Sequence, residues 1–147
     1  MLLTKKKYRQ ARKFIKGFGN NMKISIEEFN KIIPAICSRE TSSNPDLWTE
    51  ENPTYGHCAI VAPLAQEYFG GDIVKVSLKD TPFEKLKSHF FNVIDGKEID
   101  FTISQFEGSV PYENVLREPA STEEMLSYPD TKRRFDLLTQ RFLKVLL

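Results

Sequence analysis

The first helical pattern of apolar residues lies in residues 25–37, SIEEFNKIIPAIC. Ser25, with Glu28 three positions later, is typical of a capping box at a helix N-terminus. The apolar positions that follow at helical spacing are Phe29, Ile32, Ile33, Ile36 and Cys37. Because Pro34 has no N–H to donate, we expect it to kink or shorten this helix. Cys37 lies on the apolar stripe and is expected in the core.

Two further helices are predicted. Residues 58–69, CAIVAPLAQEYF, are apolar enough for a buried helix that ends at Gly70-Gly71, with Pro63 an awkward interior residue. Residues 129–147 form an amphipathic pattern near the end of the chain. Its apolar side is expected to hold Phe135, Leu138, Phe142 and Val145.

The strand signals lie between these two helices. Residues 72–78, DIVKVSL, predict a short strand. Residues 88–106, SHFFNVIDGKEIDFTISQF, predict two strands joined at Asp95-Gly96, a dipeptide typical of tight hairpin turns. Helices followed by strands and a closing helix indicate the α+β class.

Residues 38–56 form a long polar loop with the only tryptophan, Trp48, which is expected in the core or at the wall of a cleft. Long loops inside compact domains are often functional. Residues 1–23 contain eight Lys and Arg and no acidic residue. The sequence therefore predicts a basic N-terminal extension, residues 1–21, before a single domain, residues 22–147. Tyr8, Phe14, Ile15 and Phe18 interleave with the charge, so the extension is a solvated helix, a contact for an anionic partner or membrane surface, or simply an upstream addition.

Composition narrows the class of protein. The length of 147 residues suits one domain, and 40% hydrophobic residues argue for a globular fold. Outside residues 1–23, 13 basic and 20 acidic residues leave no basic face for nucleic acid. Two cysteines favour a reducing compartment, and neither a membrane span nor a secretion signal is recognisable, so we expect a cytoplasmic protein.

The register of the predicted hairpin places candidate residues on one face. Counting outward from a two-residue turn at Asp95-Gly96 pairs His89 with Thr102. The same count pairs Phe91 with Asp100. Side chains alternate between the faces of a strand, so these four residues share one face.

His89 and Asp100 are then diagonal neighbours, roughly 7–8 Å apart at the backbone. Asn92 is the rival partner for His89 and a candidate residue of the substrate cleft, but it points to the opposite face from His89. The register therefore favours Asp100 as the group that orients His89. A longer turn would shift this register.

Cys58 is the candidate nucleophile, because it stands where the polar loop becomes a helix. A helix N-terminus and a nearby imidazolium both lower the pKa of a thiol, and a carboxylate on His89 would stabilise that imidazolium. Asn52, six residues earlier, is a candidate donor to an oxyanion. His57 is expected to project away from Cys58 and to cap the helix or line the cleft.

Each of these residues has an ordinary structural alternative: a buried thiol at Cys58, a satisfied strand histidine at His89 and a turn carboxylate at Asp100. A zinc site built from Cys37, His57, Cys58 and His89 is disfavoured, because no metal-ligand spacing is present. We expect no metal and no cofactor.

The segments NPTYGHCAIVAPLAQEYFGGDIV, SHFFNVIDGKEIDFTISQF and TKRRFDLLTQRF resemble the YunG-like family of uncharacterised bacterial proteins. That family has the patterns N-P-x-x-G-Q-C-A, S-H-Y-W-N, D-G-x-x-I-D-L-T and R-Y-x-L-L, and the resemblance covers about residues 45–145. The family in turn looks like a small papain-like or transglutaminase-like fold. There a cysteine begins a helix packed on an antiparallel sheet that carries His and Asp.

The resemblance implies that Cys58 is the nucleophile, His89 the base and Asp100 the orienting group. His57 stands where the family has Gln, and Pro63 replaces an apolar helix residue. Two functions are expected: a thiol hydrolase or acyl transferase acting on an amide or thioester of a small molecule, peptide or protein, or a binding or regulatory domain without turnover.

Overall fold

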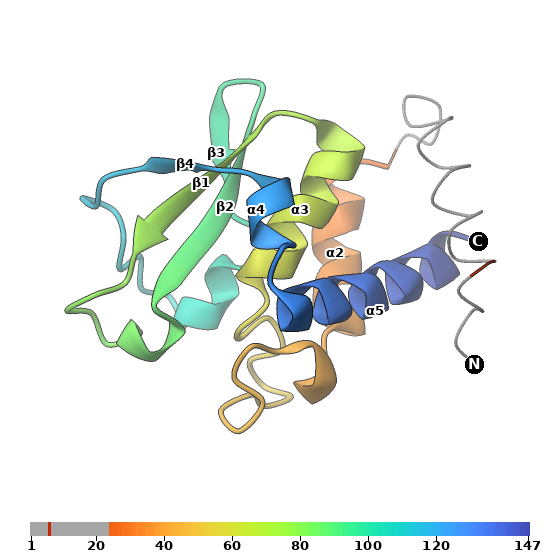
Figure 1. The fold of residues 1–147 in the computed structure, drawn as a ribbon, viewed down its shortest axis with the longest axis horizontal. Helices are drawn as coiled ribbons and strands as arrows, with labels where there is room; N and C mark the ends of the chain where they lie inside the picture. Colours follow the sequence, from red (N-terminus) through yellow and green to blue (C-terminus); the bar gives the residue numbers. More distant parts are fainter. Residues whose placement is uncertain (1–5, 7–23) are drawn as a thin grey trace.

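The computed structural model describes residue 6 and residues 24–147, so the predicted extension, residues 1–21, lies outside the described residues apart from Lys6. The helices, strands and 3₁₀ turns follow one another along the chain (Figure 1). In order they are α2 (Ile26–Ile36), η1 (Arg39–Thr41), α3 (Cys58–Phe69), β1 (Asp72–Ser77), η2 (Glu84–Leu86), β2 (Ser88–Ile94), β3 (Lys97–Ile99), η3 (Ile103–Phe106), β4 (Glu118–Ala120), α4 (Thr122–Met125) and α5 (Pro129–Leu146). This is the expected α+β class.

The four strands form one antiparallel sheet in the order β3-β2-β1-β4. β1 pairs along its full length with residues 88–93 of β2, and β2 continues into the predicted hairpin. Ile94 pairs with Lys97, which confirms a two-residue turn at Asp95-Gly96. Both turn residues have positive φ, 51° for Asp95 and 77° for Gly96, as a type I′ turn requires.

The second strand of the hairpin is shorter than predicted. Pairing ends at Asn92 and Ile99, so the expected pairs of His89 with Thr102 and Phe91 with Asp100 do not form. The side chain of Asp100 accepts the backbone N–H of Thr102 at 3.0 Å, which makes a local turn and takes that donor out of the ladder. The chain then enters η3, within the segment predicted to be strand.

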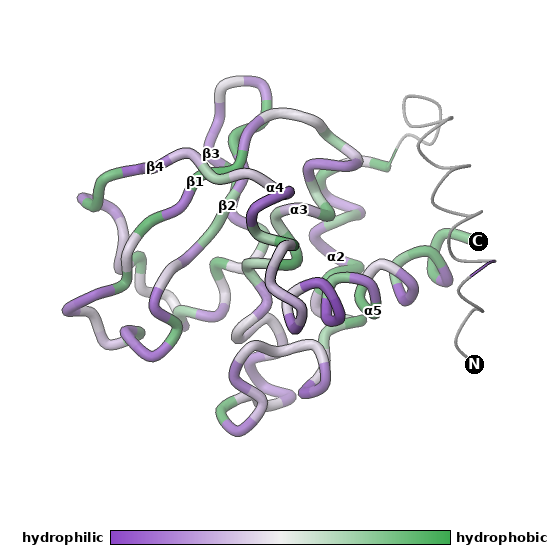
Figure 2. The backbone as a smooth tube through the Cα atoms, in the orientation of Figure 1, coloured by the Kyte–Doolittle hydropathy of each residue, from purple (hydrophilic) through white to green (hydrophobic). Residues whose placement is uncertain are grey.

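α3 lies between the sheet and the other two long helices (Figure 1). Its buried positions surround most of the helix, which explains why its sequence is apolar on nearly every side. Hydrophobic positions recur where α2, α3 and α5 meet (Figure 2). The largest buried side chains of this core are Phe29 and Ile33 of α2, Ile60 and Leu64 of α3, and Phe135, Leu138 and Phe142 of α5.

The helix ends largely follow the sequence signals. Ser25 caps α2 by accepting the N–H of Glu28 at 3.0 Å, and the helix ends two residues after Pro34. Cys37 is buried, as expected. The prediction for Val145 is wrong: this residue is 55% exposed, whereas Phe142 and Leu146 of the same helix pack against the core.

Candidate functional site

Cys58 is the first residue of α3, at the end of the helix nearest to the start of β2. Its Sγ lies 4.0 Å from the carbonyl oxygen of Ser88, and the residue is only 6% exposed. The turn before it depends on Gly56, which has a φ of +76° and lies against the hydroxyls of Ser42 and Ser43. A Cβ at this position would collide with both hydroxyls, so only glycine fits the turn that presents Cys58.

His89 lies on β2 with its ring fully buried, and its Nε2 is 2.6 Å from Oδ2 of Asp100. A carboxylate accepts only, so Nε2 carries the proton of this contact and Nδ1 is the nitrogen available to the remaining neighbours. Burial alone would lower the pKa of His89. Hydrogen bonds and charge interactions with Asp100 and Cys58 outweigh burial and raise this pKa to about 9. The imidazolium form is therefore favoured at neutral pH.

Asp100 is held by more than one donor. Its Oδ1 accepts from the backbone N–H of Thr102 at 3.0 Å, and its Oδ2 accepts from the hydroxyl of Tyr112 at 2.6 Å as well as from His89. Burial, followed by the hydrogen bond to Asp100, raises the pKa of Tyr112, so this phenol stays protonated and remains a donor. The carboxylate is thus fixed in position.

Aromatic rings enclose the His89 imidazole. The ring centroids of Phe106, Tyr112 and Phe91 lie 4.7, 5.1 and 5.9 Å from that of His89. Phe91 and Tyr112 also stack on each other, with the guanidinium of Arg117 5.7 Å from each ring. Water is largely excluded here, which strengthens the interaction between the imidazole and Asp100.

Gln105, on η3, joins the two halves of the site, and its role was not predicted from the sequence. Its side chain is fully buried. Its Oε1 accepts the N–H of Gly56 at 3.2 Å, and its Nε2 lies 3.0 Å from the hydroxyl of Thr102 and 3.4 Å from Nδ1 of His89. One amide therefore contacts the turn before Cys58, the ring of His89 and the turn after Asp100.

Arg134, on α5, lies on the other side of the Cys58 turn and was also missed. Its side chain is 4% exposed, and its guanidinium donates to the carbonyls of Thr41 at 3.2 Å and Gly56 at 3.5 Å. Its charged partner Asp130 is 68% exposed, with a contact of 3.1 Å. Burial lowers the pKa of Arg134, whereas Asp130 and the charge of Cys58 raise it. A buried positive charge therefore interacts with the thiolate form of Cys58.

The accessory residues suggested by sequence occupy different surroundings. Asn52 lies beside the site, but its amide donates to the carbonyl of Gln105 at 3.0 Å. Its Oδ1 is buried without a partner. Trp48 is half-buried, and its indole N–H donates to the carbonyl of Pro53. This hydrogen bond connects two residues of the same loop, residues 38–56. These contacts give Asn52 and Trp48 structural roles in the loop that precedes Cys58.

Asn92 lies on the opposite face of the sheet from His89. Its amide donates to the carbonyl of Ala62 at 2.9 Å and thereby ties α3 to β2. The sequence-based choice of Asp100 over Asn92 as the contact of His89 therefore agrees with the structure. Asn92 does not line a substrate cleft, because its amide is buried beneath α3.

His57 points away from Cys58 into the interior, and no side-chain cap bond forms at α3. Its Nδ1 lies 2.9 Å from the carbonyl of Tyr55, and its Nε2 lies 2.7 Å from the hydroxyl of Thr41. A carbonyl only accepts, so Nδ1 carries the proton of a neutral ring. The pKa of His57 is lowered to about 4. Burial is the main cause; the hydrogen bond to Tyr55 opposes it, and the charge of the nearby Arg134 adds to it. His57 is therefore a neutral structural residue and does not line a cleft.

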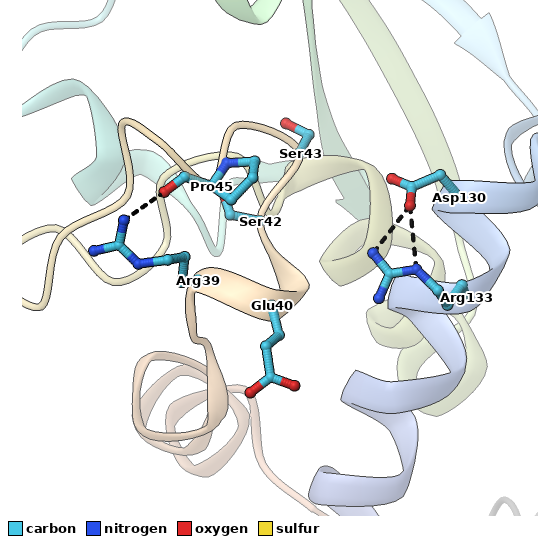
Figure 3. Close-up of a pocket in the computed structure, with 7 residues that line it drawn as sticks. All are labelled: Arg39, Glu40, Ser42, Ser43, Pro45, Asp130 and Arg133. Carbon is cyan, nitrogen blue, oxygen red and sulfur yellow. Dashed lines mark hydrogen bonds and ion pairs between the residues drawn. The ribbon is translucent and has the colours of Figure 1, made fainter.

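A cavity of about 380 Å³ lies outside this cluster (Figure 3). It is lined by Arg39, Glu40, Ser42, Ser43, Pro45, Asp130 and Arg133. Its two arginines are already engaged, Arg39 with the carbonyl of Pro45 at 3.0 Å and Arg133 with Asp130 at 2.9 Å. It is lined by no cysteine and no histidine, so we do not assign the thiol chemistry to it.

The described part of the chain contains no cluster of three or more His, Cys, Asp and Glu side chains placed to hold a metal ion. The other thiol, Cys37, has its pKa raised to about 12 by burial despite the nearby charge of Arg141. It belongs to the core. Of the two cysteines, only Cys58 contacts a histidine.

The fold and the cluster define a small α+β protein in which a cysteine at a helix N-terminus contacts a buried His–Asp pair. A sequence model described as "YunG protein" matches residues 25–147, and the chain belongs to this family. It is 35% identical to "Uncharacterized protein YunG" of Bacillus subtilis (strain 168) over 99 residues, covering 67% of this chain and 76% of that protein. No solved structure matches the chain. No helix in residues 24–147 is both long and apolar enough to cross a membrane.

Proposed function

We propose that this protein is a cysteine-nucleophile hydrolase or acyl transferase that acts on an amide or thioester bond through Cys58, His89 and Asp100. The observation that carries the proposal is the 2.6 Å contact between Nε2 of His89 and Asp100 in a histidine that also contacts Cys58. A raised imidazole pKa favours an ion pair with a thiolate, which is the reactive form of cysteine. The same proposal includes a papain-like or transglutaminase-like fold for this chain.

In the first half of the reaction, the thiolate of Cys58 attacks the carbonyl carbon and a sulfur–carbon bond forms. The carbonyl oxygen becomes an oxyanion, for which the backbone N–H groups at the start of α3 are suitable donors. The bond to the leaving amine or thiol then breaks. The imidazolium of His89 gives its Nδ1 proton to that leaving group, and an acyl thioester remains on Cys58.

In the second half, water or an amine attacks the thioester. Neutral His89 takes the proton of the attacking group through Nδ1, and the sulfur–carbon bond breaks. Departure of the acyl product restores the thiolate and the imidazolium. Asp100 accepts the hydrogen bond from Nε2 of His89 throughout and stabilises the charged ring. It does not itself become protonated.

A non-catalytic binding or regulatory domain is the second candidate. The observation that favours it is the low exposure of the site, 6% for Cys58 and 0% for His89.

The proposed location is the cytoplasm. The two free cysteines, Cys37 and Cys58, suit a reducing compartment and support this location.

Thiol alkylation separates the two candidates. We expect iodoacetamide at pH 6–7 to label Cys58 well ahead of Cys37, and the change His89→Ala to slow the labelling of Cys58 at least about tenfold. Labelled peptides are counted by mass spectrometry in the folded protein. Equal labelling of the two cysteines, or a rate that ignores His89, contradicts the proposal and leaves the binding domain.

A further inference from the structure

Tyr112 reaches the proposed catalytic pair from residues 107–117, a segment without helix or strand. Its hydroxyl donates to Oδ2 of Asp100 at 2.6 Å. Nε2 of His89 lies at the same distance, 2.6 Å, from the same oxygen. The proposed reaction uses the imidazole and the carboxylate, and the phenol has no step in it.

Two donors therefore share one carboxylate oxygen. A short bond from an O–H group to a carboxylate is charge-assisted and stabilises the anion. Because the phenol disperses the negative charge of Asp100, the carboxylate attracts the proton on Nε2 of His89 less strongly than it would alone. The other oxygen, Oδ1, already accepts from the N–H and the hydroxyl of Thr102 at 3.0 and 3.3 Å, so neither donor can move to it.

The phenol is enclosed on the face of the sheet that carries His89. Its ring stacks on Phe91 with centroids 5.1 Å apart, and it lies 5.1 Å from the ring of His89. Tyr112 is only 5% exposed. Burial, followed by the bond to Asp100, raises the pKa of its hydroxyl, so the group is a donor at neutral pH.

Arg117 holds the segment that carries Tyr112. Its Nη1 donates to three backbone carbonyls of the segment at 2.7 to 3.2 Å, one of them that of Tyr112 itself. Its other nitrogens donate to the carboxylate of Glu98 at 3.1 to 3.3 Å. Arg117 directly precedes β4 and Glu98 lies on β3, so this ion pair connects the two edges of the sheet.

We infer that Tyr112, held by Arg117, is a positioning residue that shares Oδ2 of Asp100 with His89 and so keeps the imidazole able to release its Nδ1 proton. The sharing matters most in the acyl thioester, because Cys58 then carries no charge and Asp100 is the anion that still favours the imidazolium. The second half of the reaction needs neutral His89 as its base. This role in turnover rests on the proposed function, whereas the sharing of Oδ2 does not.

The test begins with Tyr112→Phe, which keeps the ring and removes only the hydroxyl. An NMR titration of His89 measures the effect in a Cys58→Ala background, where no thiolate couples to the imidazole. Among the described residues, the other charged or titratable groups near this pair are Asp100, Glu98 and Arg117. The pKa of His89 should rise, because Asp100 loses its second donor. Tyr128→Phe, at a position that is 63% exposed, is the matched control and should leave the titration unchanged.

A merely structural role predicts the opposite sign. If Tyr112 only held Asp100 in place, loss of the hydroxyl would loosen the contact with His89, and the pKa of His89 would fall toward its ordinary value of 6.5. A fall, or no change, in Tyr112→Phe therefore overturns the inference.

Arg117→Met tests how the phenol is held. This change should raise the pKa of His89 less than Tyr112→Phe does, because it loosens the segment without removing the hydroxyl. It should add little in the double variant, since the charge of Arg117 is 31% exposed and screened by solvent. An effect of Arg117→Met that is equally large with and without the Tyr112 hydroxyl overturns the part assigned to Arg117.

The role in turnover is measured with p-nitrophenyl acetate as a small acyl donor. A first burst of nitrophenolate reports acylation of Cys58, confirmed by mass spectrometry, and the slower steady rate reports hydrolysis of the thioester. At pH 7, Tyr112→Phe should lower the steady rate at least about threefold, because less of His89 is neutral. The burst rate should stay within about twofold, because nitrophenolate leaves without a proton.

The outcomes separate the claims. An unchanged steady rate in Tyr112→Phe overturns the role of the phenol in turnover. Absence of any burst in the unaltered protein overturns the proposed function, and the NMR titration then still decides whether Tyr112 and His89 share the charge of Asp100.

Discussion

Oε1 of Gln105 accepts the backbone N–H of Gly56 at 3.2 Å, so a side chain of η3 fixes the turn from which Cys58 projects. The same amide places its Nε2 3.4 Å from Nδ1 of His89. The positions of thiol and imidazole are therefore not set independently by α3 and β2. A single buried amide connects them.

The first prediction concerns Gln105→Ala. Because the change frees both the Gly56 turn and the His89 ring, we expect the rate of Cys58 alkylation at pH 7 to fall about tenfold. Gln66→Ala is the matched control, since Gln66 makes two similar hydrogen bonds, with Gly71 and Thr122, away from the site. Its unfolding free energy should fall by a comparable amount without any change in alkylation. Equal effects of both variants on the rate would reduce Gln105 to a structural residue.

The second prediction concerns the charge of Arg134. The charged groups facing Cys58 are His89 from β2 and Arg134 from α5, whereas His57 is neutral near pH 7. Removing the buried guanidinium with Arg134→Met should slow the alkylation of Cys58 near neutral pH, because the thiolate loses a nearby positive charge. Arg134→Lys retains the charge and should slow the alkylation less. The measurement is the pH dependence of the alkylation rate.

Arg133→Met is the control for this prediction. Arg133 also contacts Asp130 but is 57% exposed, so solvent screens its charge. Its profile should coincide with that of the unaltered protein. Arg134→Met also leaves the carbonyls of Thr41 and Gly56 without their donor and is expected to lower the melting temperature. Loss of stability with an unchanged pH profile would limit Arg134 to holding the loop.

Local signals predicted much of the fold, and long-range contacts explain what was missed. Ser25, Gly70 and the Asp95-Gly96 turn each act through neighbouring residues, and the structure confirms the elements that they delimit. β4 has only three residues, including a proline, and forms through its pairing with β1. Nothing in a three-residue segment could predict that pairing.

The candidate site shows the same division. The contact of His89 with Asp100 was predicted from a continuous ladder, and it occurs although the ladder ends at Ile99, because the Asp100 turn keeps the carboxylate on the same face. Gln105 and Arg134 reach Gly56 across 49 and 78 residues of sequence. Polar contacts at such separations leave no periodic pattern, so the sequence did not indicate them.

The third prediction concerns Asp100→Asn and the pH dependence of stability. The pKa of His89 rises from 6.5 in the unfolded chain to about 9 in the folded protein. A raised folded pKa contributes stability that is complete below about pH 6.5 and is lost as the pH rises through about 9. The full shift corresponds to roughly 3 kcal/mol, of which Asp100 supplies a part. The stability advantage of the unaltered protein over Asp100→Asn should therefore shrink between pH 6.5 and 9.

Urea unfolding at several pH values, with an NMR titration of His89, measures this difference. Asn92→Ala is the control, because it removes the bond to Ala62 without touching the histidine. We expect its loss of stability to be independent of pH across this range and the reactivity of Cys58 to be unchanged. Asp100→Asn should depress that reactivity. A constant difference between the unaltered protein and Asp100→Asn over the same range would contradict the assignment.

The last prediction concerns His57, the other of the two histidines in the chain. Burial lowers its pKa from 6.5 to about 4, so the unfolded chain binds a proton that the folded protein excludes. Stability from this residue is complete above about pH 6.5 and is lost as the pH falls toward 4, by roughly 3 kcal/mol. In His57→Gln, the amide can donate to Tyr55 and accept from Thr41 without titrating. We expect this variant to lose less stability than the unaltered protein between pH 6.5 and 4, with similar stability at pH 7.

His89→Gln is the matched control. It should change the pH dependence of the unfolding free energy above pH 6.5, and not below it. Urea unfolding at pH 7, 5.5 and 4.5 decides the point, and parallel curves for His57→Gln and the unaltered protein would show that His57 is not the acid-sensitive group.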